Sequence, residues 1–104
     1  NLMNFQSPWF LPPNGESRKQ VQIRTTNWLL SILHDKNLNA QQYTIGVFGH
    51  GLAFGCLLQS IMGLDGSAAT RVWFDNCSIS RLRFDCRGWH IDCLNDTGHL
   101  AGLL

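Results

Sequence analysis

The sequence predicts an α/β fold, and three patterns along the chain support this class. Apolar residues recur at helical spacing over residues 17–35 and again after Gly51. Between these segments lies a short β-branched and aromatic run, residues 43–48, of the kind buried in parallel sheets. Two strand-like segments, residues 77–85 and 88–94, follow near the end of the chain. A helix, a strand and a second helix in this order are typical of α/β proteins.

The first helix is predicted over residues 17–35. Ser17 and Gln20 stand three residues apart in the pattern of a capping box, which marks a helix start. The apolar residues at helical spacing are Val21, Trp28, Leu29, Ile32 and Leu33. The preceding residues 1–15 are rich in Pro, Asn and Gly, and we expect them to form a connector without regular structure.

The predicted strand at 43–48 leads through Gly49-His50-Gly51 into a second helix, which Gly63 should end. The apolar residues of this helix are Phe54, Leu57, Leu58, Ile61 and Met62. Only a few residues separate the strands at 77–85 and 88–94, so we expect an antiparallel hairpin beside the parallel strand. Residues 95–104 should form a tail that packs on the domain.

Length and charge narrow the class of protein. The chain has 104 residues and a mass of 11.7 kDa, which suits one small domain. A net charge of +1, with 14% charged residues, predicts neither a nucleic-acid partner nor a membrane partner. No apolar run approaches the roughly 20 residues of a transmembrane helix. The chain begins at Asn1 without a signal peptide, and we expect it to be part of a longer protein.

Four cysteines and four histidines could suggest a metal site, but their spacing does not. Close Cys-Cys and His-His pairs, which supply most structural zinc sites, are missing from the sequence. In a secreted protein the cysteines could form two disulfides. Without a signal peptide we expect reduced, mostly buried thiols, a cytoplasmic location, and no metal or other cofactor.

His50 occupies the position at which chemistry is expected. It lies between two glycines, at the carboxyl end of a predicted strand and the start of a helix, where open α/β sheets bind ligands. Backbone N–H groups at a helix start favour an anion, and Gly51 would let that anion approach the main chain. A structural histidine, hydrogen-bonded within a tight turn, is the alternative interpretation.

These residues resemble a known family. Residues 48–51, Phe-Gly-His-Gly, precede an apolar helix that ends in Met-Gly-Leu at residues 62–64. This arrangement is similar to the second-histidine motif of the histidine phosphatase superfamily, which includes phosphoglycerate mutases and α-ribazole phosphatase-like enzymes.

Three further segments resemble the same family, in the same order. Residues 13–17, Pro-Asn-Gly-Glu-Ser, with Arg24 downstream, are similar to its P-x-G-E-S segment and following arginine. Residues 74–79 contain its D-N-x-S pattern, and residues 94–100, after Trp89, match the L-N-D-T-x-H-L ending of its phosphatase branch. The four segments cover nearly the whole chain, and the likeness is to the C-terminal half of the family domain.

The resemblance implies a fold and a reaction. The fold would be part of a three-layer αβα arrangement with a mostly parallel sheet and a C-terminal antiparallel strand pair. In the family, a histidine within an Arg-His-Gly motif attacks the phosphoryl group and forms a phosphohistidine, which water or a second substrate discharges. The implied activity of the longer protein is hydrolysis of a small phosphomonoester without a metal.

The resemblance also assigns roles. His50 would be the second histidine, donating to the phosphoryl oxygens in the transition state, and Gly51 and Leu52 would add backbone N–H groups. Glu16 and Arg24 are expected to support the fold, not to act as the acid or the phosphate ligand. Asn95 and His99 are expected to hold the C-terminal tail by hydrogen bonds.

Some family features differ or are missing. Leu52 stands where a small residue is frequent and Gly55 where a basic one often occurs, which leaves the substrate undefined. No Arg-His-Gly is present. We therefore expect residues 1–104 to be the C-terminal half of one histidine phosphatase-like domain, inactive alone and able to form a homo-oligomer. The alternatives are a phosphoglycerate mutase-type phosphotransferase and a non-catalytic module that binds phosphate or another partner.

Overall fold

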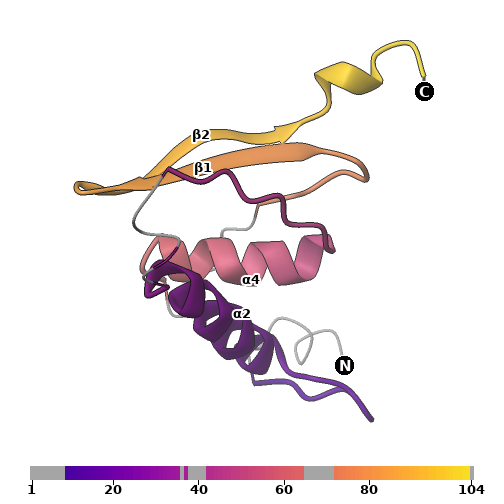
Figure 1. Ribbon diagram of the computed structural model, residues 1–104. Helices are drawn as coiled ribbons and strands as arrows, with labels where there is room; N and C mark the ends of the chain where they lie inside the picture. The colour runs from indigo at the N-terminus through magenta and orange to yellow at the C-terminus, as the bar shows by residue number, and fades with distance from the viewer. Residues whose placement is uncertain (1–8, 36, 38–41, 65–71, 104) are drawn as a thin grey trace. The chain divides into compact units, whose positions relative to one another are not determined.

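The computed structural model describes residues 9–35, 37, 42–64 and 72–103. Within these residues the regular elements with defined bounds are the helices α2 (Arg18–Leu33) and α4 (Gly51–Ile61), the strands β1 (Ile79–Asp85) and β2 (Gly88–Asp96), and the short 3-10 helix η1 (Gly98–Leu100) (Figure 1). The chain divides into two compact units, Asn1–Thr70 and Arg71–Leu104. Helices α2 and α4 lie in the first unit, and the strands and η1 lie in the second. The predicted mixture of α and β structure is therefore confirmed.

Helix α2 begins at the predicted capping box. The Ser17 hydroxyl accepts the N–H of Gln20 at 3.1 Å, and the Ser17 N–H donates to Gln20 Oε1 at 2.8 Å. These bonds satisfy two backbone donors that would otherwise lack partners at the helix start. At the other end, the His34 N–H donates to the carbonyl of Leu30 at 3.0 Å. The helix predicted over residues 17–35 is confirmed, one residue shorter at its start and two at its end.

Replacing Ser17 by Ala should destabilise the first unit by about 1 kcal/mol, because it removes the acceptor of the cap. Thermal unfolding followed by circular dichroism at 222 nm measures this loss. The matched control is Ser31→Ala, which makes the same change on the exposed face of α2 and should cost less. Equal losses from the two substitutions would mean that the capping box contributes nothing.

Gly63 closes helix α4, as predicted, two residues after the last helical residue. Gly63 has a φ of +78°, a left-handed conformation that glycine adopts without steric cost. Its N–H donates to the Ser60 carbonyl at 3.0 Å, and the Leu64 N–H donates to the Gln59 carbonyl at 2.8 Å. This pair of bonds is the Schellman motif that commonly closes a helix.

The two helices pack against each other around a small core (Figure 1). The buried apolar side chains of the described residues are Val21 from α2 and Cys56 and Leu58 from α4. Polar bonds cross the interface at its edge, where Thr26 Oγ1 donates to Ser60 Oγ at 2.7 Å. The buried Gln22 side chain also donates to the Leu64 carbonyl at 2.9 Å. The side chains of α2 thus hold both α4 and the residues that close it.

The strand predicted at residues 43–48 is not formed, and this prediction is wrong for the structure of the described residues. Residues 42–50 have no regular secondary structure and each of them is exposed. Phe48 is 98% exposed, and Tyr43, Ile45 and Val47 are each nearly half exposed. A strand exists through hydrogen bonds to a neighbouring strand, and no strand within the described part of the chain pairs with this segment.

Strands β1 and β2 form the predicted antiparallel hairpin. Asp85 pairs with Gly88, so Cys86 and Arg87 form a two-residue turn. The rings of Phe84 and Trp89 face each other across the strands, with centroids 5.0 Å apart and planes inclined by 58°. Such tilted aromatic pairs stabilise neighbouring strands.

Charged groups gather around Asp85 at the turn of the hairpin. Asp85 Oδ1 accepts the Arg87 N–H at 2.8 Å and lies 3.0 Å from His90 Nε2, while Arg83 approaches Oδ2 at 3.2 Å. The hydrogen bond from the Arg87 N–H, followed by that from His90, lowers the pKa of the Asp85 carboxyl. Asp92 continues the network, at 3.4 Å from Arg83.

The lowered pKa of Asp85 predicts that the hairpin weakens in acid. The contribution of this carboxylate is fully present above its unfolded pKa and is lost as the pH falls from about 4 through the folded value. The NMR shifts of the Phe84 and Trp89 rings report hairpin formation across this range. Asp85→Asn should reduce the change of those shifts below about pH 4, because this carboxylate no longer takes part. An unchanged acid transition in the variant would contradict this assignment.

The four cysteines are free, but they are not mostly buried as predicted. Cys56 is buried in α4 and Cys93 is partly covered, whereas Cys77 and Cys86 are exposed. Cys86 is exposed because it lies in the two-residue turn of the hairpin. Cys77 lies in the turn before β1, with a φ of +62°. Residues 1–8 of the predicted connector lie outside the described residues.

Candidate functional site

His50 is the N-cap residue of α4. Its backbone is extended, with φ −121° and ψ 155°, and its side chain makes no capping hydrogen bond. The first intrahelical bond of α4 runs from the Phe54 N–H to the His50 carbonyl at 3.0 Å. The N–H groups of Gly51, Leu52 and Ala53 come before this bond, so the helix offers them no acceptor. His50, Gly51 and Leu52 are all exposed.

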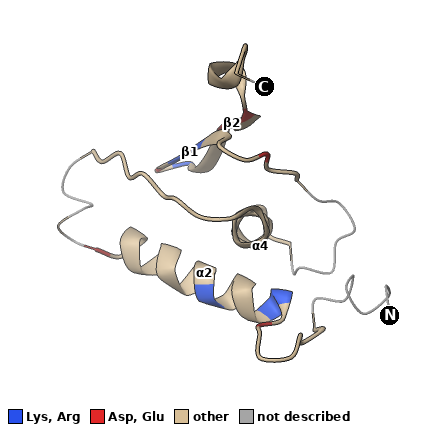
Figure 2. Cartoon of the chain, turned by 90° about the vertical axis from the view of Figure 1, so that its right-hand side faces the viewer, with Lys and Arg blue, Asp and Glu red and all other residues tan. Residues whose placement is uncertain are grey.

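The structure therefore places the three predicted site residues side by side at one helix end. An imidazole and two backbone N–H groups stand next to the positive end of the α4 dipole. Figure 2 shows that α4 itself carries neither Lys, Arg, Asp nor Glu, and the sequence has none over residues 42–64. Selectivity for an anion would come here from hydrogen-bond donors and the helix dipole, with no neighbouring side-chain charge from this segment.

Glu16 and Arg24 bind each other at the start of α2. Arg24 donates from Nε and Nη2 to the two carboxylate oxygens of Glu16, at 3.0 and 2.9 Å. This bond is the main cause that lowers the pKa of Glu16, and in return it raises the pKa of Arg24. A general acid at neutral pH needs a raised pKa, so Glu16 is unsuited to that task. The prediction that both residues support the fold agrees with this pairing.

Asn95 and His99 form hydrogen bonds within the second unit. Asn95 Oδ1 accepts the Asp75 N–H at 2.7 Å, and Asn95 Nδ2 donates to Asp75 Oδ2 at 3.1 Å. His99 Nε2 lies 2.8 Å from the Cys77 carbonyl. These contacts join residues 74–79 to residues 94–100, two of the segments that carry the family resemblance. The predicted hydrogen bonds are present: His99 holds the segment after β2, whereas Asn95 lies within β2 itself.

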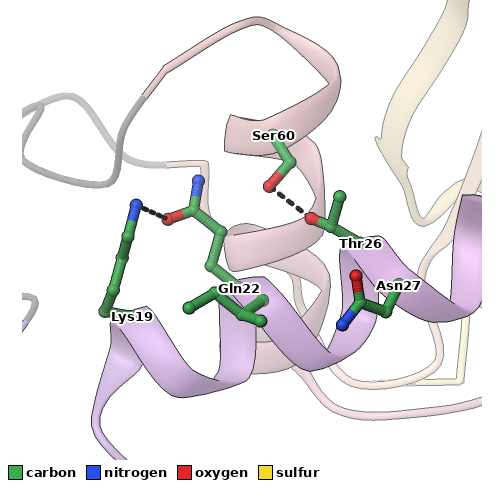
Figure 3. Close-up of a pocket in the computed structure, with 6 residues that line it drawn as sticks. Lys19, Gln22, Thr26, Asn27 and Ser60 are labelled. Atoms are coloured by element: carbon green, nitrogen blue, oxygen red, sulfur yellow. Dashed lines mark hydrogen bonds between the residues drawn. The ribbon is translucent and has the colours of Figure 1, made fainter.

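Two surface pockets were not predicted from the sequence. One, of about 240 Å³, lies between α2 and α4, where Figure 3 shows Gln22 bound to Lys19 and Thr26 bound to Ser60. It is lined by Lys19, Gln22, Ile23, Thr26, Asn27 and Ser60. Polar residues spaced four apart on the packed face of α2 were the available signal. The hydrogen bonds between the helices already use the Gln22, Thr26 and Ser60 side chains.

The second pocket, of about 480 Å³, lies in the second unit beside the turn before β1. It is lined by Asp75, Asn76, Cys77, Thr97 and Leu100. Asp75 is already bound to Asn95 and to the Trp73 Nε1 donor, at 2.8 Å. His50 does not line either of these two pockets.

Neither a metal-binding cluster nor a membrane-spanning helix is found among the described residues. Within residues 9–35, 37, 42–64 and 72–103, His, Cys, Asp and Glu side chains do not gather in a group of three that could hold a metal ion. The helices in the described part of the chain are too short or too polar to cross a membrane.

Comparison with known proteins gives a consistent family. The sequence profile of the histidine phosphatase superfamily (branch 1) matches residues 2–97. Over 93 residues the chain is 41% identical to "Probable phosphoglycerate mutase GpmB" of Yersinia pestis (strain Pestoides F) and 36% identical to the protein of that name in Klebsiella pneumoniae (strain 342). The corresponding Proteus mirabilis protein is 33% identical over 100 residues.

These alignments cover most of this chain but less than half of each relative. They include 85% of the chain for the Yersinia and Klebsiella proteins and 88% for the Proteus protein. The chain spans only 41 to 43% of the length of these relatives. No solved structure matches the chain. The profile match nonetheless extends over nearly all residues, and the chain belongs to the histidine phosphatase superfamily, branch 1.

Proposed function

We propose that this chain supplies the second phosphate-binding histidine of a phosphoryl-transfer site. His50 donates from its ring to the phosphoryl oxygens, and Gly51 and Leu52 donate from their backbone N–H groups. The position of His50 at the N-cap of α4, with an uncommitted side chain beside unpaired helix donors, is the observation that carries the proposal. These donors would stabilise the charge that develops on the phosphoryl oxygens.

The nucleophile comes from another part of the protein. The resemblance places it in an Arg-His-Gly motif, and this sequence has no such motif. Glu16, which is paired with Arg24, does not supply the acid. The chain thus corresponds to the C-terminal half of one domain, and the reaction requires residues from the other half.

The exposure of residues 43–48 supports this arrangement. Tyr43, Ile45 and Val47 are β-branched or aromatic and remain about half exposed, and Phe48 is almost fully exposed. Such residues are normally covered in a parallel sheet, whose strands have neighbours on both edges and helices on both faces. In the whole domain this segment is a strand of a three-layer αβα sheet. The same exposed surface would favour a homo-oligomer of the isolated chain.

The proposed reaction is hydrolysis of a small phosphomonoester through a phosphohistidine. The ending Leu-Asn-Asp-Thr-Gly-His-Leu at residues 94–100 favours the phosphatase branch. Phosphoglycerate mutase activity is the second candidate, because the relatives from Yersinia and Klebsiella carry that name. The proposed hydrolysis calls for neither a metal nor another cofactor. The four free cysteines favour a reducing, cytoplasmic location.

A hybrid protein tests the proposed function. In this hybrid the present chain replaces the matching 41% of the Yersinia relative, which supplies the remaining sequence. The hybrid should release inorganic phosphate from p-nitrophenyl phosphate, and the 104-residue chain alone should not. Assaying the hybrid for phosphoglycerate mutase activity separates the two candidates. Phosphate release by the isolated chain, at the rate of the hybrid, would contradict the need for a second half.

A further inference from the structure

The turn that presents His50 has few restraints. Every residue from 42 to 50 is exposed, and the His50 side chain makes no capping bond to the helix. Elsewhere in the first unit, the start of α2 is fixed by two reciprocal side-chain bonds. A different contact must therefore fix the direction in which the His50 side chain points from the start of α4.

Phe54 provides that contact twice. Its N–H donates to the His50 carbonyl at 3.0 Å, which closes the first turn of α4. Its ring lies against Gly49: a Cβ placed on Gly49 would be 3.1 Å from Cζ and 3.3 Å from Cε1 of Phe54. Side chains on a helix point back toward its N-terminus, so a residue in the first turn of α4 is well placed to cover the preceding backbone.

This contact favours a glycine at residue 49. The φ of Gly49 lies outside the left-handed region, in contrast to that of Gly63, so its conformation does not demand glycine. Space favours it, because a Cβ at residue 49 would make an unusually tight contact with the far edge of the Phe54 ring, which would have to shift by a few tenths of an ångström. The atoms involved belong to a rigid ring that has only two rotatable bonds and is itself half-buried.

We propose that Phe54 is a positioning residue for His50. Its ring and its N–H hold the backbone on both sides of the Gly49–His50 peptide, and thereby fix the direction of the imidazole and the Gly51 N–H. This proposal rests on the proposed function, because a fixed direction matters only if these groups bind phosphate. A small displacement of a binding group is enough to slow a phosphoryl transfer substantially.

A substitution cycle in the 104-residue chain tests this positioning. Gly49→Ala should shift the NMR amide signals of residues 50–52, because the new methyl group meets the Phe54 ring. Phe54→Leu should shift the same signals, because it removes the covering ring. In the double variant the signals should match those of Phe54→Leu alone, because leucine lacks the Cζ and Cε atoms that meet the methyl group.

Two matched controls exist in the same segment. A Cβ on Gly46 would make only an ordinary contact, 3.6 Å from Phe48, and the Phe48 ring is 98% exposed. Gly46→Ala and Phe48→Leu should leave the signals of residues 50–52 in place. The proposal is overturned if Gly49→Ala moves these signals no more than Gly46→Ala does, or if Gly49→Ala moves them as far in the Phe54→Leu background as it does with Phe54 present. Unchanged helicity by circular dichroism separates repositioning from unfolding.

The hybrid protein reports the consequence for catalysis. Gly49→Ala should lower its kcat by about tenfold or more, Phe54→Leu should also lower it, and adding Gly49→Ala to Phe54→Leu should change kcat by less than about threefold. A hybrid without any activity contradicts the proposed function, whereas the NMR cycle still decides the positioning by Phe54. An active hybrid in which Gly49→Ala has no effect on kcat contradicts the positioning alone.

Discussion

Replacing His50 by Ala is expected to lower the kcat of the hybrid enzyme by about 10²- to 10³-fold, which corresponds to roughly 3–4 kcal/mol of transition-state stabilisation. The physical reason is the loss of a donor aimed at the phosphoryl oxygens, in a segment without a charged side chain to replace it. Release of inorganic phosphate from p-nitrophenyl phosphate measures the effect.

The controls separate this role from a structural one. His50→Gln keeps an N–H donor and should recover part of the rate. His34→Ala changes an exposed histidine at the end of α2 and should leave kcat unchanged. If His50→Ala and His34→Ala give the same kcat, His50 is only a residue of the turn, which is the structural alternative that the sequence left open.

Leu58→Ala is expected to destabilise the first unit by about 2–5 kcal/mol, the usual loss for truncating a buried leucine. Leu58 is 4% exposed, and the other buried apolar residues in the described part of the chain are only Val21 and Cys56. A core of this size has little capacity to absorb a cavity. Urea unfolding followed by circular dichroism at 222 nm measures the change.

Leu30→Ala is the matched control for this substitution. Leu30 lies on α2 and is 42% exposed, so its truncation removes much less buried surface. The expected order is a large loss for Leu58→Ala and a loss of less than about 1 kcal/mol for Leu30→Ala. Similar losses would show that Leu58 is not part of a tightly packed core.

Local chemistry made the helices predictable. The Ser17–Gln20 pair identifies the start of α2, and Gly63 identifies the end of α4, because the bonds that define these ends connect residues close in sequence. The hairpin was predictable for the same reason, since two residues separate β1 from β2. Whether residues 43–48 form a strand was not predictable in this way, because a strand needs a neighbouring strand and no local pattern guarantees one.

In the candidate site too, some features follow from the sequence and others do not. The position of His50 at the start of α4 follows from the glycines around it and from the periodicity of the helix. The packing of Phe54 on Gly49 does not follow from them, since the sequence suggested only that Gly49 belongs to the turn before the helix and that Gly51 eases the approach of an anion. The bonds between Asp75 and Asn95 join residues 20 positions apart, and periodicity carries no information about such pairs.

The assignment of His50, Gly51 and Leu52 to a phosphate site can be tested in a crystal structure of the hybrid with orthovanadate, a mimic of the transferring phosphoryl group. A ring nitrogen of His50 and at least one N–H of Gly51 or Leu52 should lie about 3 Å from vanadate oxygens. Vanadate bound in the hybrid with His50 turned to solvent, and with the α4 N-terminus unoccupied, would contradict the assignment.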